Sequence, residues 1–285
     1  MNKFRLFTLT SMAMIAFAGN SLLCRAALKD TDIDAASFTT VRLISAAAVL
    51  WLLLGKRRGG GTASGNWPSA IALFVYAAGF SFAYVSLPAA TGALLLFAAV
   101  QATMMGYGFW TGERLHHLQL IGVLLAFGGL VGLLLPGLSA PPLLGSVVMC
   151  IAGVAWGIYS LRGRNAFDPS LVTTGNFLRA APLSVAMSLW MSKGVSFDFA
   201  GYGYAVASGG LASGIGYAVW YMVLPKLKAT HAATLQLSVP IFAALGAVLI
   251  LGEAITPRLL FASFAILGGI FLVLCTQSKV DLSHD

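Results

Sequence analysis

The chain has 285 residues, of which 59% are hydrophobic and only 9% are charged, and its mean hydropathy is +0.88. A soluble core cannot use that much apolar surface, so the composition predicts a polytopic helical membrane protein. The formal charge of +8 does not indicate a nucleic-acid partner, because the basic residues lie in short stretches between apolar runs. Three widely separated cysteines without CxxC spacing predict neither a metal site nor a disulfide framework.

Ten apolar runs follow one another, each roughly 20 residues long as a bilayer of about 30 Å requires. The predicted spans are 4–27, 35–54, 67–87, 90–111, 117–136, 141–162, 170–192, 201–223, 229–251 and 256–276. The first resembles a signal peptide, but it lacks a small-residue cleavage site and has a counterpart later in the chain, so we expect it to be retained. The connections are short, and the longest, 56–66, is a glycine-rich linker.

The basic residues favour one side of the membrane. If both termini are cytoplasmic, eleven of the 17 Lys and Arg residues fall in inner loops and tails, and Arg42 and Arg179 fall within spans. The outer side then receives only Arg25, Lys29, Lys193 and Arg258. The positive-inside rule therefore predicts cytoplasmic termini.

The two halves of the chain repeat each other. At an offset of 137 the matches are Ala18/Ala155, Arg25/Arg162, Arg42/Arg179, Gly79/Gly216, Tyr84/Tyr221 and Leu87-Pro88/Leu224-Pro225. At an offset of 140, Gly112-Glu113 and Gly128-Gly129 match Gly252-Glu253 and Gly268-Gly269. We divide the chain into a first five-helix repeat, 1–139, and a second, 140–285. Because each copy has an odd number of spans, the second enters the membrane inverted, as in alternating-access transporters.

A Gly-Glu pair at the end of spans 4 and 9, a Gly-Gly pair in spans 5 and 10, and the five-plus-five repeat resemble the drug/metabolite transporter superfamily, and its EamA-type exporters above all. The resemblance covers nearly the whole chain. It implies a plasma-membrane exporter of small metabolites with a central cavity between spans 1, 3, 4, 6, 8 and 9. The aromatic amino acid exporters of the superfamily are similar in size and in their aromatic spans.

Aromatic and polar side chains recur in the middle of these spans. Tyr76, Phe80 and Tyr84 follow each other every four residues and share one helix face. Aromatic residues facing lipid are the alternative, but amides and hydroxyls at this depth need partners and usually face a wet interior. We predict a substrate site lined by Asn20, Tyr76, Phe80, Tyr84, Phe97, Gln101, Trp156, Tyr159, Ser213, Tyr217, Trp220 and Gln236.

The two arginines within spans need a reason, because a charge at this depth costs about 2.5–3.5 kcal/mol on insertion scales. Arg42 and Arg179 could bind a substrate carboxylate, or could cap helix carbonyls and snorkel to the nearer interface. Their depths of about 10–14 Å favour the structural role, and spans 2 and 7 lie outside the cavity that the resemblance implies.

The repeated glycine motifs are interpreted as structural. Glu113 and Glu253 precede spans 5 and 10, where a carboxylate favours the helix N-terminus, and Pro257 suits a first turn. The Gly-Gly pairs allow close helix contact. Pro240 is placed to interrupt a helix near the middle of the membrane.

No Asp or Glu lies inside a predicted span, and His231 is the one faint candidate for a proton relay. We therefore predict an inner-membrane exporter of aromatic or other large neutral amino acids and related metabolites, working by facilitated alternating access as a monomer in the lipid bilayer. No catalytic residue, cofactor or metal is expected. The alternatives are a proton-coupled exporter of drugs or other metabolites, and, from other classes, an intramembrane enzyme or a scaffold.

Overall fold

The computed structural model describes residues 3–54, 64–111, 117–137, 140–163, 168–191, 198–224, 227 and 235–281, and these ranges contain helices and no strand. The helices are α1 (Lys3–Asp30), α2 (Ala35–Leu54), α3 (Trp67–Tyr84), α4 (Ala89–Trp110), α5 (His117–Leu134), α6 (Leu143–Gly163), α7 (Pro169–Met191), α8 (Phe199–Val206), the π-helix η2 (Ala207–Ile215), α9 (Gly216–Val223), α11 (Ser238–Leu251) and α12 (Pro257–Asp281). Gly112, Glu113, Pro225 and His231 lie outside the described residues.

Seven of these helices are long and apolar enough to cross a membrane by themselves. The other predicted spans correspond to α7, to the continuous run of α8, η2 and α9, and to the shorter apolar helix α11. The prediction of an all-α polytopic membrane protein is confirmed, because each of the ten predicted apolar runs contains helix in the part that the structure describes.

The helix starts explain where the polar residues between the spans lie. A side chain just before the helix accepts hydrogen bonds from the first free backbone N–H groups of α2, α3, α7, α8 and α12. These caps are Asp34, Asn66, Asp168, Asp198 and Thr256. Asp198 also accepts from the backbone N–H of Asp32, and these hydrogen bonds hold the pKa of its carboxyl below the usual value. Several acidic residues outside the spans are thus helix caps.

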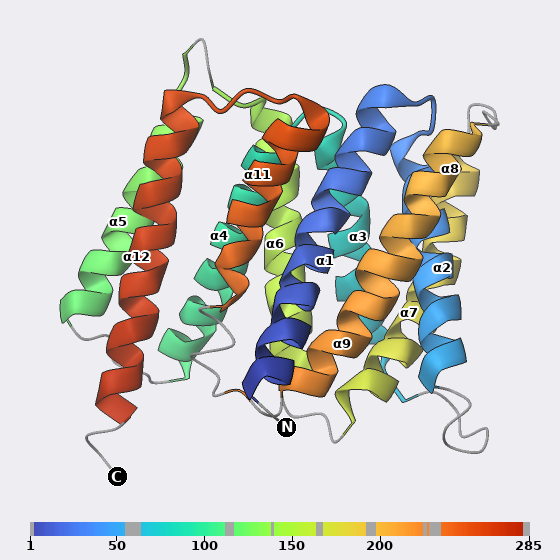
Figure 1. Ribbon diagram of the computed structural model, residues 1–285, viewed down its shortest axis with the longest axis horizontal. Coiled ribbons are helices and arrows are strands. Elements are labelled where there is room, and N and C mark those ends of the chain that lie inside the picture. The colour runs from blue at the N-terminus through green and yellow to red at the C-terminus, as the bar shows by residue number, and fades with distance from the viewer. Residues whose placement is uncertain are drawn as a thin grey trace.

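The packing of the helices follows the predicted inverted repeat. α1 packs against α9 and α11, while its counterpart α6 packs against α3 and α4; α2 packs against its own counterpart α7. In Figure 1, α1 begins and α12 ends at the same end of the bundle, drawn lowermost. The opposite end, called the upper end, carries the connections α1–α2, α3–α4 and α11–α12. The boundary between the repeats at 139/140 stays a prediction.

One glycine of each Gly-Gly pair lies in a tight contact between α5 and α12, which stand side by side at one edge of the bundle (Figure 1). A Cβ on Gly129 would come within 2.7 Å of Ala265 Cβ, and one on Gly269 would collide with the carbonyl oxygen of Gly122. Gly128 and Gly268 face open space. The predicted packing role therefore applies to the second glycine of each pair.

The eighth span differs from the uniform α-helix that its sequence pattern predicts, because residues 207–215 form a π-helix. A Cβ on Gly209 would collide with the backbone carbonyl oxygen of Arg42, so this glycine lets η2 lie directly against the backbone of α2. π-Helical turns are rare and occur frequently at functional sites.

The ninth span is interrupted near Pro240, as predicted, but the interruption is at Leu237 and not at the proline. Leu237 forms a turn, and α11 begins at Ser238, so Pro240 occupies the first turn of that helix. A proline there leaves no hydrogen bond unmade, because the first backbone N–H groups of a helix have no partner within the helix.

Candidate substrate-binding site

Aromatic rings from both repeats meet at the centre of the bundle. Trp156 of α6 lies 4.7 Å from Tyr76 of α3 and 5.4 Å from Tyr217 of α9, measured between ring centroids. These separations are in the favourable range for aromatic pairs. Further ring contacts join them into one group, called the aromatic cluster, which consists of Phe17, Tyr76, Phe80, Tyr84, Trp156, Tyr159, Phe177, Tyr217, Trp220 and Tyr221.

A chain of buried polar groups crosses one side of this cluster. The hydroxyl of Tyr76 accepts from Arg42 Nη2 at 3.1 Å and from Asn20 Nδ2 at 3.5 Å. The Oδ1 atom of Asn20 in turn accepts from Ser208 Oγ at 2.5 Å. Ser208 belongs to the π-helix, so α1, α2, α3 and η2 each contribute one member. The arrangement offers polar groups for a ligand head beside rings that suit an apolar body.

Arg42 is a correction to the sequence interpretation. Its side chain is 2% exposed and its guanidinium carbon lies 4.7 Å from the Phe80 ring centroid, so it points into the bundle and does not snorkel to an interface. The depth of a residue along a helix does not determine which way its side chain faces. Arg179 differs: it is half-buried, and its Nη1 donates to the carbonyl of Gly175 in its own helix. Arg179 thus contacts a helix carbonyl as one of the structural alternatives predicts, whereas snorkelling is contradicted for Arg42.

The structure brings most of the predicted site residues together. Asn20, Tyr76, Phe80, Tyr84, Trp156, Tyr159, Tyr217 and Trp220 all belong to the aromatic cluster or to its polar chain. Within the described residues, no ring contact or hydrogen bond joins the remaining four to this group. Of these, Phe97, Gln101 and Ser213 are buried and Gln236 is half-buried.

Five members of the cluster and its polar chain were not predicted as site residues: Phe17, Arg42, Phe177, Ser208 and Tyr221. Arg42 and Phe177 lie on spans 2 and 7, which the resemblance placed outside the cavity. The π-helix determines where Ser208 faces, and it has no signature in the sequence. The sequence does carry one signal for Arg42, since a charge within a span is costly and usually faces the bundle interior.

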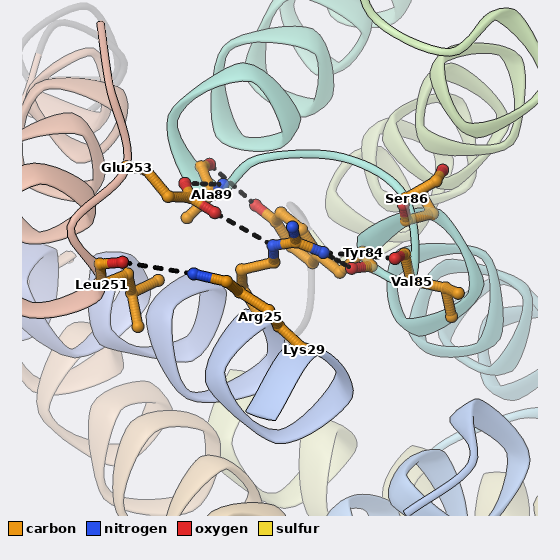
Figure 2. A network of polar contacts seen from close by, with 9 residues as sticks. Arg25, Lys29, Tyr84, Val85, Ser86, Ala89, Leu251 and Glu253 are labelled. Carbon is orange, nitrogen blue, oxygen red and sulfur yellow. Dashed lines mark hydrogen bonds and ion pairs between the residues drawn. The ribbon is translucent and has the colours of Figure 1, made fainter. Parts of the chain in front are cut away.

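At the upper end, an ion pair ties α1 to the α3–α4 and α11–α12 connections (Figure 2). Arg25 Nε donates to Glu253 Oε1 at 3.0 Å, and Arg25 Nη1 donates to the carbonyls of Tyr84 and Val85. Glu253 Oε2 accepts from the backbone N–H of Ala89 at 2.7 Å. We call these contacts the Arg25–Glu253 clamp. Because Tyr84 also contacts Phe80, the clamp covers the upper end of the aromatic cluster.

Glu253 does cap a helix, but a different one from the helix predicted. The first residue of α4 is Ala89, so the carboxylate caps α4 and not α12, which Thr256 caps. Gly252 makes this possible, since it ends α11 with φ of +61°, a left-handed conformation that favours glycine. Arg162, the repeat counterpart of Arg25, donates to Ser69 and Asn66 at the start of α3.

A cavity of about 230 Å³ lies beside the clamp at the upper end. Its polar lining consists of Ser86, Thr91, Glu253 and Thr256, and apolar residues of the α3–α4, α5–α6 and α11–α12 connections and of the adjoining helices complete it. It is separate from the aromatic cluster, none of whose members lines it. Within the described ranges, no three His, Cys, Asp or Glu side chains are close enough together to bind a metal ion.

An inverted repeat of membrane-spanning helices, with aromatic and polar side chains at the interface of the two copies, is the architecture of a multi-pass membrane transporter. Comparison with known proteins agrees. Residues 143–275 match the EamA-like transporter family. The chain is 57% identical over 274 residues to an uncharacterised protein of Pseudomonas aeruginosa, with 96% of each chain covered.

Two more distant relatives are transporters by name. The chain is 25% identical to an uncharacterised transporter of Archaeoglobus fulgidus, over 95% of this chain and 98% of the relative. It is also 25% identical to a probable amino-acid metabolite efflux pump of Escherichia coli, over 65% of this chain and 67% of the relative. A crystal structure that is 20% identical has the same fold, with a TM-score of 0.69 over 98% of this chain and 99% of that one.

Residues 143–275 therefore form an EamA-like transporter domain, which belongs to the drug/metabolite transporter superfamily.

Proposed function

We propose that the protein exports small amphipathic metabolites, aromatic and other large neutral amino acids among them, across a bacterial inner membrane. The observation that carries this proposal is the aromatic cluster with its polar chain, since both repeats contribute to it and Trp156 joins them. As the two halves move apart, the rings would pack against a large apolar side chain, and Asn20, Tyr76 and Ser208 beside them would bind a polar head. The name of the Escherichia coli relative supports the amino-acid class.

The mechanism we infer is alternating access, in which the two five-helix halves rock about the cluster. The Arg25–Glu253 clamp holds the upper end together, and its opening would release substrate there. The excess of basic residues in the opposite loops supports an upper end outside the cell and both termini in the cytoplasm. Export then runs down the gradient of the substrate, without obligatory exchange for a proton.

The test is transport by the purified protein in liposomes. Radiolabelled phenylalanine, tryptophan, leucine, lysine and glutamate are loaded one at a time, and efflux is compared with that from liposomes without protein. We expect faster efflux of phenylalanine, tryptophan and leucine than of lysine. If no amino acid moves while drugs or other metabolites do, the substrate class is wrong. If nothing in a broad metabolite panel moves or stabilises the protein, a scaffold role replaces transport.

A further inference from the structure

Arg42 keeps hydrogen-bonding capacity that its surroundings leave unused. Its side chain is 2% exposed, and Nη2 donates to the Tyr76 hydroxyl at 3.1 Å. Neither Nε nor Nη1 has a hydrogen-bond partner within the described part of the chain. A guanidinium carries five N–H donors on two forked edges that share Nη2. Whichever hydrogen of Nη2 Tyr76 accepts, one complete two-donor edge remains open.

The charge of Arg42 also has no acidic counterpart among the described residues. Its guanidinium carbon lies 4.7 Å from the ring centroid of Phe80 and 5.3 Å from that of Tyr76. Ring faces attract a cation, but they cannot accept two parallel N–H bonds as a carboxylate does. Within the described residues, the carboxylate that forms an ion pair with an arginine is that of Glu253. Its partner is Arg25, and both lie at the upper end. The sequence has no Asp or Glu inside a span.

The position of this open edge relates it to the aromatic cluster. The guanidinium is bonded to Tyr76, and the Tyr76 ring lies 4.7 Å from Trp156 and 5.6 Å from Phe80. The backbone of Arg42 is held in place, because its carbonyl oxygen lies against Gly209 of the π-helix. An anionic group bound at Arg42 would therefore have its apolar body beside the rings.

We propose that Arg42 binds a free carboxylate of the transported substrate, which narrows the substrate class to amphipathic metabolites that carry an acid group. The carboxylate takes the open edge in a bidentate contact and neutralises the buried charge. This assignment rests on the proposed export function, because it concerns the substrate of the same site. An ammonium group on the substrate is not required by it.

The repeat supplies a matched control, since Arg179 occupies the corresponding position of the second half. Its Nη1 is already bonded to Gly175 of its own helix. The residue that corresponds to Tyr76 is Ser213, which has no ring to hold a guanidinium at the cluster. Arg179 therefore does not form a second carboxylate subsite.

The experiment uses three probes that share a phenyl ring. Phenylalanine carries a carboxylate and an ammonium, 3-phenylpropionate a carboxylate alone, and phenylalanine amide an ammonium alone. Dissociation constants are measured by calorimetry on the full-length protein in detergent, and efflux is measured in liposomes. We expect the amide to bind about 10- to 100-fold more weakly than the two acids, the range for losing a hydrogen-bonded charged contact.

Variants of Arg42 and Arg179 test which arginine causes the difference in affinity between the acids and the amide. In Arg42→Gln the two acids should weaken to the affinity of the amide, and in Arg42→Lys, which keeps the charge but loses the fork, they should weaken less. Arg179→Gln should keep the full difference between acids and amide. Elution as a single species and an unchanged melting temperature show that each variant is folded. If a variant does not fold, the three probes still test carboxylate recognition on the unaltered protein.

Three results would overturn the assignment. If the amide binds the unaltered protein as tightly as phenylalanine, the carboxylate is not recognised. If Arg42→Gln is folded and still binds the acids more tightly than the amide, a group other than Arg42 recognises the carboxylate. If none of the three probes binds, the subsite is absent, whereas efflux of a metabolite without an acid group would still uphold export.

Discussion

Trp156 contacts aromatic rings of both repeats. It contacts Tyr76 of the first repeat and Tyr159 and Tyr217 of the second, at centroid distances of 4.7, 5.3 and 5.4 Å. Trp156→Ala removes the ring from all three contacts. Because aromatic pairs contribute about 0.5–1.5 kcal/mol each beyond burial, we expect phenylalanine efflux in liposomes to fall by about tenfold or more.

A matched tryptophan controls for general effects of the substitution. Trp190 lies near the end of α7 and is 91% exposed, so Trp190→Ala should leave efflux unchanged. Trp156→Phe keeps a ring and should retain an intermediate rate. Both variants should elute as the unaltered protein does. Efflux by Trp156→Ala equal to that of Trp190→Ala would remove Trp156 from the site.

The residue types of the candidate site could be predicted from the sequence, but not all of the residues that the structure brings together there. Tyr76, Phe80 and Tyr84 follow a helical period, so their common face is fixed by geometry. The orientation of the Arg42 side chain could not be predicted, because the sequence of α2 is not amphipathic and does not show which face meets the bundle. Neighbouring helices decide that orientation, and they are distant in the sequence.

At the scale of the element, the two glycines of a Gly-Gly pair lie in different surroundings. Alanine substitutions of the two are therefore expected to have opposite effects on stability. Gly269→Ala forces a Cβ against the Gly122 carbonyl and within 2.7 Å of the Ala126 nitrogen, so we expect a loss of about 1–3 kcal/mol of stability. Gly268→Ala meets nothing within 4 Å and should be neutral, or stabilising by up to about 1 kcal/mol. Thermal unfolding in detergent measures both.

The first repeat provides the same comparison with Gly129→Ala and Gly128→Ala. If α5 and α12 pair as described, the two sites of tight contact should respond alike, since Gly129 faces Ala265 and Ile266 across the same interface. Equal melting temperatures for Gly268→Ala and Gly269→Ala would contradict the close approach of these helices.

The Arg25–Glu253 clamp is also an element-scale device, because it joins α1, the α3–α4 connection and the α11–α12 connection. Glu253→Gln removes the ion pair and the charged cap of α4, and should lower stability by about 1–3 kcal/mol. It should also expose Thr91, which lines the neighbouring cavity and is 6% exposed. Labelling of Thr91→Cys by an impermeant maleimide, with the three native cysteines replaced, measures that exposure.

A control variant at the upper end distinguishes opening of that end from a general loss of stability. Arg258 donates to the Leu135 carbonyl at 2.7 Å, a contact with a backbone group and not with a carboxylate. Arg258→Gln should therefore change the labelling rate of Thr91→Cys much less than Glu253→Gln does. Equal rates in the two variants would mean that the clamp does not hold the upper end closed.

The helices themselves were predictable because span length and apolar composition follow from the thickness of the bilayer. The π-helix was not, since a shift of the hydrogen-bond register in residues 207–215 leaves composition unchanged. The capping of α4 by Glu253 could not be predicted either. It joins residues 164 positions apart, across the two repeats, whereas capping rules describe a residue and the helix that follows it.

At the scale of the whole molecule, the inverted repeat is symmetric in its helices and asymmetric in its chemistry. The helix contacts of the two halves correspond, yet Tyr76 corresponds to Ser213 and Trp156 to Gly19. The proposed alternating access needs symmetry, because the same halves would pack in two alternative ways, whereas a single ligand has no such symmetry. The site therefore departs from the repeat while the scaffold keeps it.

The distribution of ionisable groups over the whole molecule predicts how transport is driven. Coupling to protons usually needs a group at depth that gains and loses one. Among the described residues, Glu253 lies at the end of the bundle that covers the cluster, and it is engaged by Arg25 and by the start of α4. We therefore expect phenylalanine efflux to run at the same rate with and without a pH gradient.

A pH-sensitive dye inside the liposomes gives the second readout of the same prediction. If no group at depth exchanges a proton, the dye should report no proton movement beyond that of protein-free vesicles while phenylalanine leaves. Efflux that stops when the gradient is removed, or that carries protons in fixed proportion, would show that export is coupled. Coupling would then require a group that changes its protonation as the two halves rock, and Glu253 would be the first to replace, because opening the upper end separates it from Arg25.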